Sequence, residues 1–169
     1  HHAEFVCVPR NLSCAVPSGL PLHLASTVTL GSIALQSVRQ AKLEIGERVA
    51  VIGLGLIGQL LLNILKANGA IISGYDISEE KVRFCQSLGF ANCFNCSSTD
   101  AVARANELTA GNLFDKVFIC SSDPTPSSTK LAFDIARKRA TVVMVGQVNL
   151  SLDRRNMYYK ELQFIASMS

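Results

Sequence analysis

Three glycines carry the clearest chemical signal in the sequence. Gly53, Gly55 and Gly58 form a G-x-G-x-x-G pattern between an apolar run rich in β-branched residues and an apolar helical run. In such a loop the first glycine permits a tight turn, the second lets the backbone approach a pyrophosphate, and the third lets the helix pack closely on the strand. Leu56 and Ile57 would open the helix, where backbone N–H groups face the phosphate charge. The pattern predicts a dinucleotide-binding loop.

Asp76 ends the next predicted strand after this loop. A carboxylate at that position can accept hydrogen bonds from both ribose hydroxyls of an adenosine, and its charge would repel a 2′-phosphate. No arginine occurs at residues 77–80 to compensate, whereas Lys81 is placed to reach the ribose edge. A glycine-rich turn alone can be a packing solution and a lone aspartate a helix cap, but together in one βαβ unit they favour a nucleotide site. We therefore expect NAD(H) as the ligand, in preference to NADP.

Alternating strands and helices must position these residues. Helical spacing predicts helices at 56–68, 78–88 (with Ser78 as N-cap), 98–108 and 127–137, and apolar β-branched runs predict strands at 48–52, 71–75, 92–95, 116–120, 141–145 and 163–168. Strands that alternate with helices pair in parallel through right-handed crossovers. The fold class predicted is therefore α/β, a Rossmann doubly wound six-stranded parallel sheet in the order 3-2-1-4-5-6.

The N-terminal region departs from this rhythm. Residues 3–9 alternate like a short strand, prolines then punctuate an irregular stretch, and residues 24–41 have the apolar spacing of one or two helices. His23 stands at a helix start, where an exposed or capping role is the simpler interpretation than a zinc ligand or proton relay. The basic run 137–139 is expected to complement the dipole at a helix end.

Composition excludes several classes of protein. With 169 residues, of which 49% are hydrophobic and 17% charged, the chain can bury one main core and is not disordered. Glycines interrupt the longest apolar stretch, residues 49–65, so it is not a membrane span. The N-terminus lacks the pattern of a secretory signal, and we expect a cytoplasmic protein. The net charge of +3 is small and scattered, which gives no support to nucleic-acid binding.

The six cysteines lack the dense spacing of a disulfide scaffold, so reduced thiols are expected. Cys93 and Cys96 form one C-x-x-C pair, which would suit half of a zinc site or a redox pair. No second pair with ligand spacing follows. A short buried strand at 92–95 is therefore the simpler interpretation.

Five further segments point to a known family. They are AEFVCVP at residues 3–9, VPSGL at 16–20, TLGSIAL at 29–35, GERV at 46–49, which leads into the glycine loop, and KELQF at 160–164. In order and spacing as well as in letters, nearly the whole chain resembles the medium-chain dehydrogenase/reductase family, the zinc-type alcohol dehydrogenases and their relatives.

The resemblance implies a division of the chain and a function for the intact protein. Residues 1–24 would be the edge of a GroES-like substrate domain whose bulk is absent, and residues 25–169 the NAD(P)-binding Rossmann domain. The intact protein would be an NAD-dependent oxidoreductase that transfers hydride between nicotinamide and an alcohol or carbonyl substrate. The fragment alone would be inactive. As in the family's dimers, strand 163–168 would pair with a second copy to form a homodimer.

The family also suggests cofactor contacts after the fourth and fifth strands. Ser121 and Ser122, then Val145 and Gly146, occupy those positions, although residues 121–124 replace a small glycine turn that is common in the family. Zinc enzymes of the family take a Cys or Glu ligand from the segment that enters the cofactor domain. The matching positions, around Val28 and Thr29, hold no plausible ligand. No catalytic residue and no metal ligand is assigned in this chain, although zinc would be possible in the intact protein.

Two other functions share the glycine loop. A regulatory Rossmann module would sense NAD(H) without catalysis, and the dehydrogenase-like segment 3–9 argues against it. A methyltransferase would use the loop for S-adenosylmethionine, and the apolar helix start after the loop argues against that. Binding assays would distinguish the methyltransferase from the two NAD-binding functions, whereas the glycine loop itself does not decide between an enzyme and a regulatory module.

Overall fold

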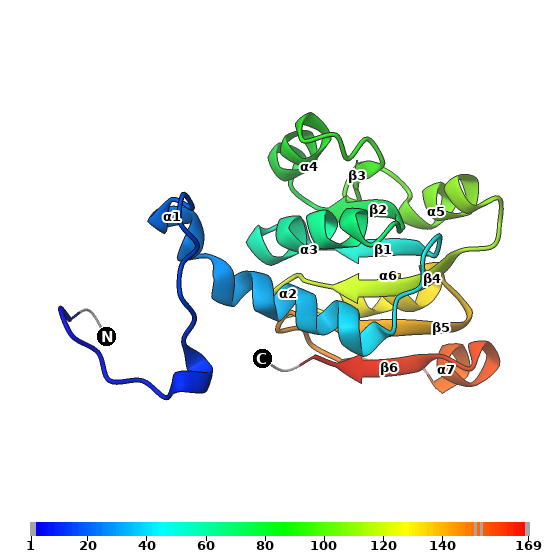
Figure 1. Cartoon of the computed structure of the whole chain (residues 1–169). Coiled ribbons are helices and arrows are strands. Elements are labelled where there is room, and N and C mark those ends of the chain that lie inside the picture. The colour runs from blue at the N-terminus through cyan, green and yellow to red at the C-terminus, as the bar shows by residue number, and fades with distance from the viewer. Residues whose placement is uncertain (1–2, 151, 153, 168–169) are drawn as a thin grey trace.

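The computed structural model describes residues 3–150, 152 and 154–167, so His1, His2 and Met168 of the last predicted strand lie outside it. Within the described residues, six parallel strands form one sheet (Figure 1). They are β1 (Arg48–Ile52), β2 (Ile71–Asp76), β3 (Cys93–Asn95), β4 (Phe114–Ile119), β5 (Ala136–Met144) and β6 (Gln163–Ala166). Their order is β3-β2-β1-β4-β5-β6, which confirms the predicted topology.

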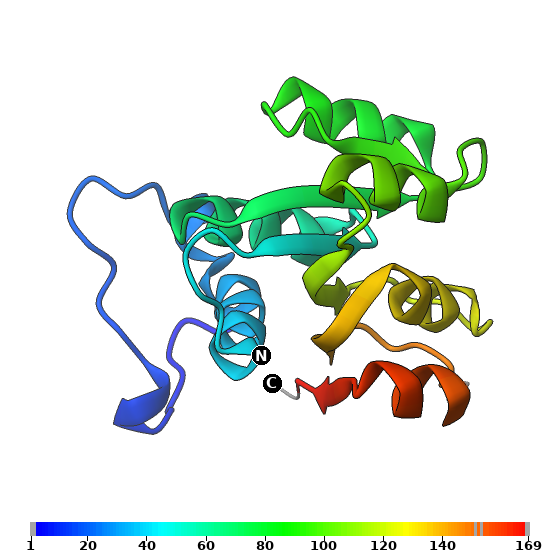
Figure 2. The same ribbon diagram turned by 90° about the vertical axis from the view of Figure 1, so that its right-hand side faces the viewer.

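Helices cover both faces of this sheet. The helices of the described residues are α1 (Leu22–Ala25), α2 (Val28–Ala41), α3 (Leu56–Ala67), α4 (Glu79–Ser87), α5 (Ala101–Thr109), α6 (Ser127–Ile135) and α7 (Arg154–Lys160), after a 3-10 turn, η1 (Arg10–Leu12). Of these, α1 lies away from the sheet (Figure 1). One apolar core joins α2, α3 and α4 to the sheet, and the other lies beneath α5 and α6. Figure 2 shows the two layers of helices on opposite sides of the strands.

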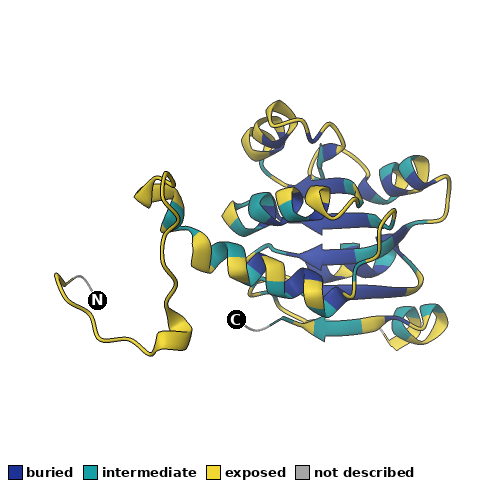
Figure 3. Ribbon diagram, in the orientation of Figure 1, coloured by how far each residue is buried: buried dark blue, intermediate teal, exposed yellow. Residues whose placement is uncertain are grey.

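The alternation of side chains along β1 explains why the centre of the sheet is buried on both faces. Val49 and Val51 enter the core under α3, whereas Ala50 and Ile52 enter the opposite core. All four are at most 4% exposed. A parallel strand buried on both faces reads as a continuous apolar run, and Figure 3 shows these strands as the most buried part of the chain. The carboxyl end of β1 is therefore held rigidly beside β2 and β4.

The N-terminal segment corrects one prediction. Residues 3–9 form no strand, and no described strand lies beside them to accept their backbone hydrogen bonds. The segment runs away from the sheet, exposed along its length (Figures 1 and 3). Phe5 is 87% exposed and Leu12 75% exposed. The alternation of residues 3–9 alone does not make a strand, because a strand needs a partner. His23 is exposed in α1, as expected.

The end of α6 corrects a second prediction. The helix stops at Ile135, and the run 137–139 lies in β5 rather than at a helix end. Arg137 pairs with Asp115, and Arg139 with Glu161. Lys160 of α7, a helix absent from the sequence prediction, instead occupies the end of α6. Its ammonium donates to the carbonyl oxygens of residues 133, 134 and 136 at 2.7, 3.0 and 2.9 Å.

In the part of the chain that the structure describes, every helix is too short or too polar to cross a bilayer.

Candidate dinucleotide site

Gly53 and Gly58 hold the loop between β1 and α3 in a geometry that larger residues cannot adopt. Gly53 has a φ of +96°, and a Cβ there would lie 2.5 Å from the backbone nitrogen of Ser121. A Cβ on Gly58 would lie 2.0 Å from the carbonyl oxygen of Gly53. The first glycine therefore makes the turn, and the third lets α3 pack directly on the end of β1.

Gly55 has a different role. Its φ is −71°, and a Cβ there would meet nothing within 4 Å, so neither strain nor packing requires glycine. Gly55 is the N-cap of α3, and no side chain caps this helix end. The first-turn N–H groups of a helix have no partner inside the helix and favour negative charge. Gly55 thus leaves an open space, called the cradle below, in front of the first-turn N–H groups of α3.

Asp76 lies at the end of β2 with its carboxylate turned toward this loop. One oxygen accepts the backbone N–H of Leu54 at 2.7 Å, and the other accepts that of Ser78 at 2.8 Å. The Lys81 ammonium lies 3.8 Å from the same carboxylate. The Asp76 side chain is 5% exposed. A carboxylate oxygen accepts more than one hydrogen bond, so Asp76 both fixes the glycine loop and keeps capacity for ligand hydroxyls.

A cavity of about 930 Å³ opens between the ends of β1 and β4. These are the two strands at which the order of strands across the sheet changes direction. Of the eleven residues predicted to contact the cofactor, six line it: Gly53, Gly55, Asp76, Lys81, Ser121 and Ser122. The others do not line it: Leu56, Ile57, Gly58, Val145 and Gly146. A Cβ on Gly146 would lie 2.1 Å from the Ser121 carbonyl oxygen, so glycine there lets the loop after β5 pack directly on the backbone of Ser121.

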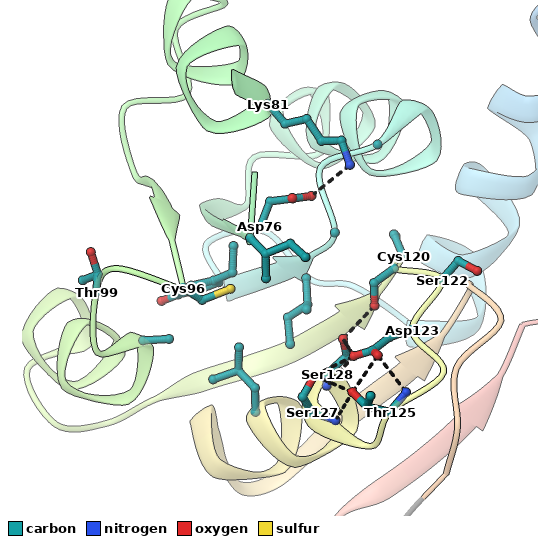
Figure 4. A pocket seen from close by; sticks show the side chains of 18 of the residues that line it. Asp76, Lys81, Cys96, Thr99, Cys120, Ser122, Asp123, Thr125, Ser127 and Ser128 are labelled. Carbon is teal, nitrogen blue, oxygen red and sulfur yellow. Dashed lines mark hydrogen bonds and ion pairs between the residues drawn. The ribbon is translucent and has the colours of Figure 1, made fainter. Parts of the chain in front are cut away.

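A cluster of hydroxyl groups around Asp123 forms one wall of the cavity and was not predicted from the sequence. Thr125 donates to one Asp123 oxygen from its hydroxyl at 2.7 Å and its N–H at 2.8 Å. Ser127 and Ser128 donate hydroxyls to the other oxygen at 2.6 and 2.9 Å. Figure 4 shows this cluster on one side of the cavity and Asp76 with Lys81 on the other. Hydrogen bonds from Ser127, and next from Thr125, hold the pKa of Asp123 well below its usual range.

Burial disfavours the thiolate form of the cysteines near the cavity. Burial raises the pKa of Cys93, in β3, and of Cys120, on the cavity wall, to about 12 each. Strand β3 confirms the short strand expected at 92–95, with Cys93 buried and the other two residues of the strand partly buried. Cys96 lines the cavity. Among the described residues, no group of three or more His, Cys, Asp or Glu side chains is arranged to hold a metal ion.

Comparison with known proteins relates this geometry to a family. The sequence profile described as zinc-binding dehydrogenase matches residues 57–169. The (R,R)-butanediol dehydrogenase of Bacillus subtilis is 33% identical over 160 residues, which are 94% of this chain and 46% of that protein. The chain spans about half the length of the curated relatives it matches.

Solved structures of similar fold support the same relation to dehydrogenases. Galactitol-1-phosphate dehydrogenase from Escherichia coli superposes with a TM-score of 0.86 and 26% identity, over 98% of this chain and 49% of that one. A zinc-binding dehydrogenase from Sinorhizobium meliloti 1021, determined bound to NADP, has a TM-score of 0.85 and 22% identity, over 95% and 48% of the two chains. Fold, topology and sequence profile together show that the chain belongs to the zinc-binding dehydrogenase family, a branch of the medium-chain dehydrogenases/reductases.

Proposed function

We propose that this chain is the cofactor-binding part of an NAD-dependent oxidoreductase, in which hydride passes between nicotinamide and an alcohol or carbonyl substrate. The observation that carries the proposal is the open cradle at Gly55 beside the buried carboxylate of Asp76. Both open onto the same cavity of about 930 Å³. That the named relatives are dehydrogenases supports an enzyme over a purely regulatory NAD(H)-sensing module.

The residues fit a nicotinamide dinucleotide in the following way. The diphosphate would lie against the backbone at Gly55 and the first-turn amides of Leu56 and Ile57. Asp76 would accept hydrogen bonds from the adenosine ribose, with the Lys81 ammonium at the ribose edge. When bound, the nicotinamide ring supplies the hydride chemistry. The chain's own residues bind and orient the cofactor, and no step is assigned to zinc.

Discrimination between NADH and NADPH tests the role of Asp76. A 2′-phosphate would meet the Asp76 charge, so we expect NADH to bind at least about tenfold more tightly than NADPH in a calorimetric titration. Asp76→Asn should reduce this difference, because the repelling charge is gone. Glu80→Gln is the matched control, since it removes the same charge from an exposed position on α4. A wild-type preference for NADPH, or no binding of either nucleotide, would contradict the assignment.

We propose a two-part organisation of the chain. Residues 1–24 belong to the edge of a GroES-like substrate domain, and residues 25–169 form the cofactor domain. The exposed apolar side chains of the described segment, Phe5 and Leu12 among them, support this division. So does the course of the segment away from the sheet in Figure 1.

We also propose that two copies pair through β6, which ends the sheet and has no described strand on its outer side. The Ser167 N–H points inward and donates to the Met144 carbonyl oxygen at 2.8 Å, so by alternation the Ala166 N–H points outward. Sedimentation equilibrium should give twice the chain mass of 18.2 kDa. Ala166→Pro removes an outward donor and should yield a folded monomer. A monomeric wild type at high concentration would refute the pairing.

A further inference from the structure

The Asp123 cluster contains a directed chain of hydrogen bonds that ends at the cavity. The Ser121 hydroxyl oxygen lies 2.9 Å from that of Ser128, which lies 2.9 Å from a carboxylate oxygen of Asp123. An ionised carboxylate only accepts hydrogen bonds, and each serine has one proton to donate. Ser128 must therefore donate to Asp123 and accept from Ser121. The proton of Ser121 is used inside the protein, and only its lone pairs remain for a ligand.

Other contacts fix the carboxylate at the start of this chain. Thr125 and Ser127 hold Asp123 from both of its oxygens. Its backbone carbonyl accepts the N–H of Asn149 at 3.1 Å, and Asp123 forms an isolated parallel bridge with Val148. The loops after β4 and β5 are thus tied together. These contacts fix the direction of the hydrogen bonds before any ligand enters.

Ser121 follows β4, and Asp76 ends β2, so the two residues line the cavity from opposite sides of β1. In a doubly wound sheet the two mononucleotide halves lie on either side of the strand-order reversal. If Asp76 holds the adenosine ribose, Ser121 faces the nicotinamide half. An oxygen that can only accept needs a donor on the ligand, and the ribose hydroxyls of that half are such donors.

We propose that Asp123 is a positioning residue that acts through Ser128, so that the Ser121 hydroxyl accepts a hydrogen bond from the ribose on the nicotinamide side of the dinucleotide. The inference rests on the proposed function and adds to it a specific recognition group. It distinguishes ligands that present a hydroxyl donor at this position from those that do not.

Asp123→Asn is the informative variant because it reverses the chain of hydrogen bonds. Two backbone N–H groups face the carboxylate, and that of Thr125, at 2.8 Å, is closer than that of Ser128, at 3.3 Å, so the amide oxygen stays on the Thr125 side. The amide NH₂ then faces Ser127 and Ser128 and donates to them. Ser128 donates to Ser121 in turn, and the Ser121 proton points into the cavity. The acceptor for the ribose hydroxyl is lost although the residues remain in place.

Calorimetric titration of this chain with NADH and with AMP tests the proposal. Ser121→Ala should weaken NADH binding about fivefold, as expected for one hydrogen bond, and leave AMP binding within about twofold because AMP lacks the nicotinamide half. Asp123→Asn should weaken NADH binding to a similar extent. The double variant should be no weaker than Ser121→Ala alone, because the two changes remove the same contact.

Ser87→Ala controls for loss of an exposed hydroxyl, since Ser87 donates only to the Phe84 carbonyl at the end of α4. The inference fails if Ser121→Ala leaves NADH binding unchanged, or if the effects of the two variants add. It also fails if Asp123→Asn weakens AMP and NADH equally, which would indicate a merely structural role. In each case intact AMP and NADH binding by the wild type would leave the proposed function standing. A wild type that binds neither nucleotide would overturn both.

Discussion

A Gly58→Ala variant should lose about 3 kcal/mol of unfolding free energy or more, the upper range for overpacking a well-packed core. The added methyl would lie 2.0 Å from the Gly53 carbonyl oxygen and 3.0 Å from its carbonyl carbon. Both neighbours are backbone atoms, so no rotamer change can relieve the overlap. Helix α3 must move off β1, and the core formed by Leu61, Leu62 and Leu65 would open.

Gly31→Ala is the matched control for this experiment. Gly31 is also helical, in α2, and a Cβ there would meet nothing within 4 Å. Because alanine is the better helix former, Gly31→Ala should raise the unfolding free energy by about 0.5–1 kcal/mol. Urea titrations of both variants give the comparison. If Gly58→Ala unfolds at the same urea concentration as the wild type, the close contact between α3 and β1 is not present in solution.

The contrast between these glycines shows why the centre of the fold could be predicted from the sequence. Strand β1 has the predicted bounds and α3 begins at the predicted Leu56. Both are defined by local features: an apolar β-branched run, then a turn that requires a positive φ at Gly53. Asp76 was located by the same logic, because the end of a strand fixes which edge of the sheet a residue occupies.

Elements that depend on distant partners were predicted less well. The helix expected to reach Arg137 ends at Ile135, although no glycine or proline stops it. Ala136 instead takes an extended conformation and pairs with Phe114 of β4. Lys160, from a helix with no buried residue and no apolar periodicity, satisfies the freed carbonyl groups. Each of these interactions joins residues far apart in the chain. The local sequence pattern around residue 135 therefore does not predict where the helix ends.

The candidate site also has one side that the sequence predicts and one that it does not. The Asp76 side was predicted from a motif with fixed spacing, whereas residues 121–128 gave only a turn signal of Ser, Asp, Thr and Pro. That composition indicates hydrogen bonds within a loop, but not that the loop lines a cavity with a carboxylate behind its hydroxyls. The direction of the bonds from Ser121 to Asp123 required the positions of all three groups.

Gly55→Ala should abolish most dinucleotide binding while leaving the fold intact. Its φ of −71° suits alanine, and the methyl would contact no other residue within 4 Å. Loss of the preferred N-cap residue should cost less than about 1 kcal/mol of unfolding free energy. The methyl would, however, occupy the space through which the diphosphate approaches the backbone. We expect NADH affinity to fall more than about tenfold, equivalent to about 1.4 kcal/mol or more of binding free energy.

Adenosine supplies the internal control, because it has the ribose that Asp76 would hold but no phosphate to meet the new methyl. Calorimetry should therefore show similar adenosine affinity for Gly55→Ala and the wild type, and a large difference only for NADH. The protein's own packing does not require glycine at position 55. The outcome therefore shows whether this glycine admits the diphosphate of the dinucleotide. If Gly55→Ala binds NADH as well as the wild type does, the cradle receives no diphosphate, and the open space before α3 is not the cofactor site. If it binds adenosine and NADH equally poorly, the methyl has disturbed the Asp76 side, and the diphosphate is not what Gly55 admits.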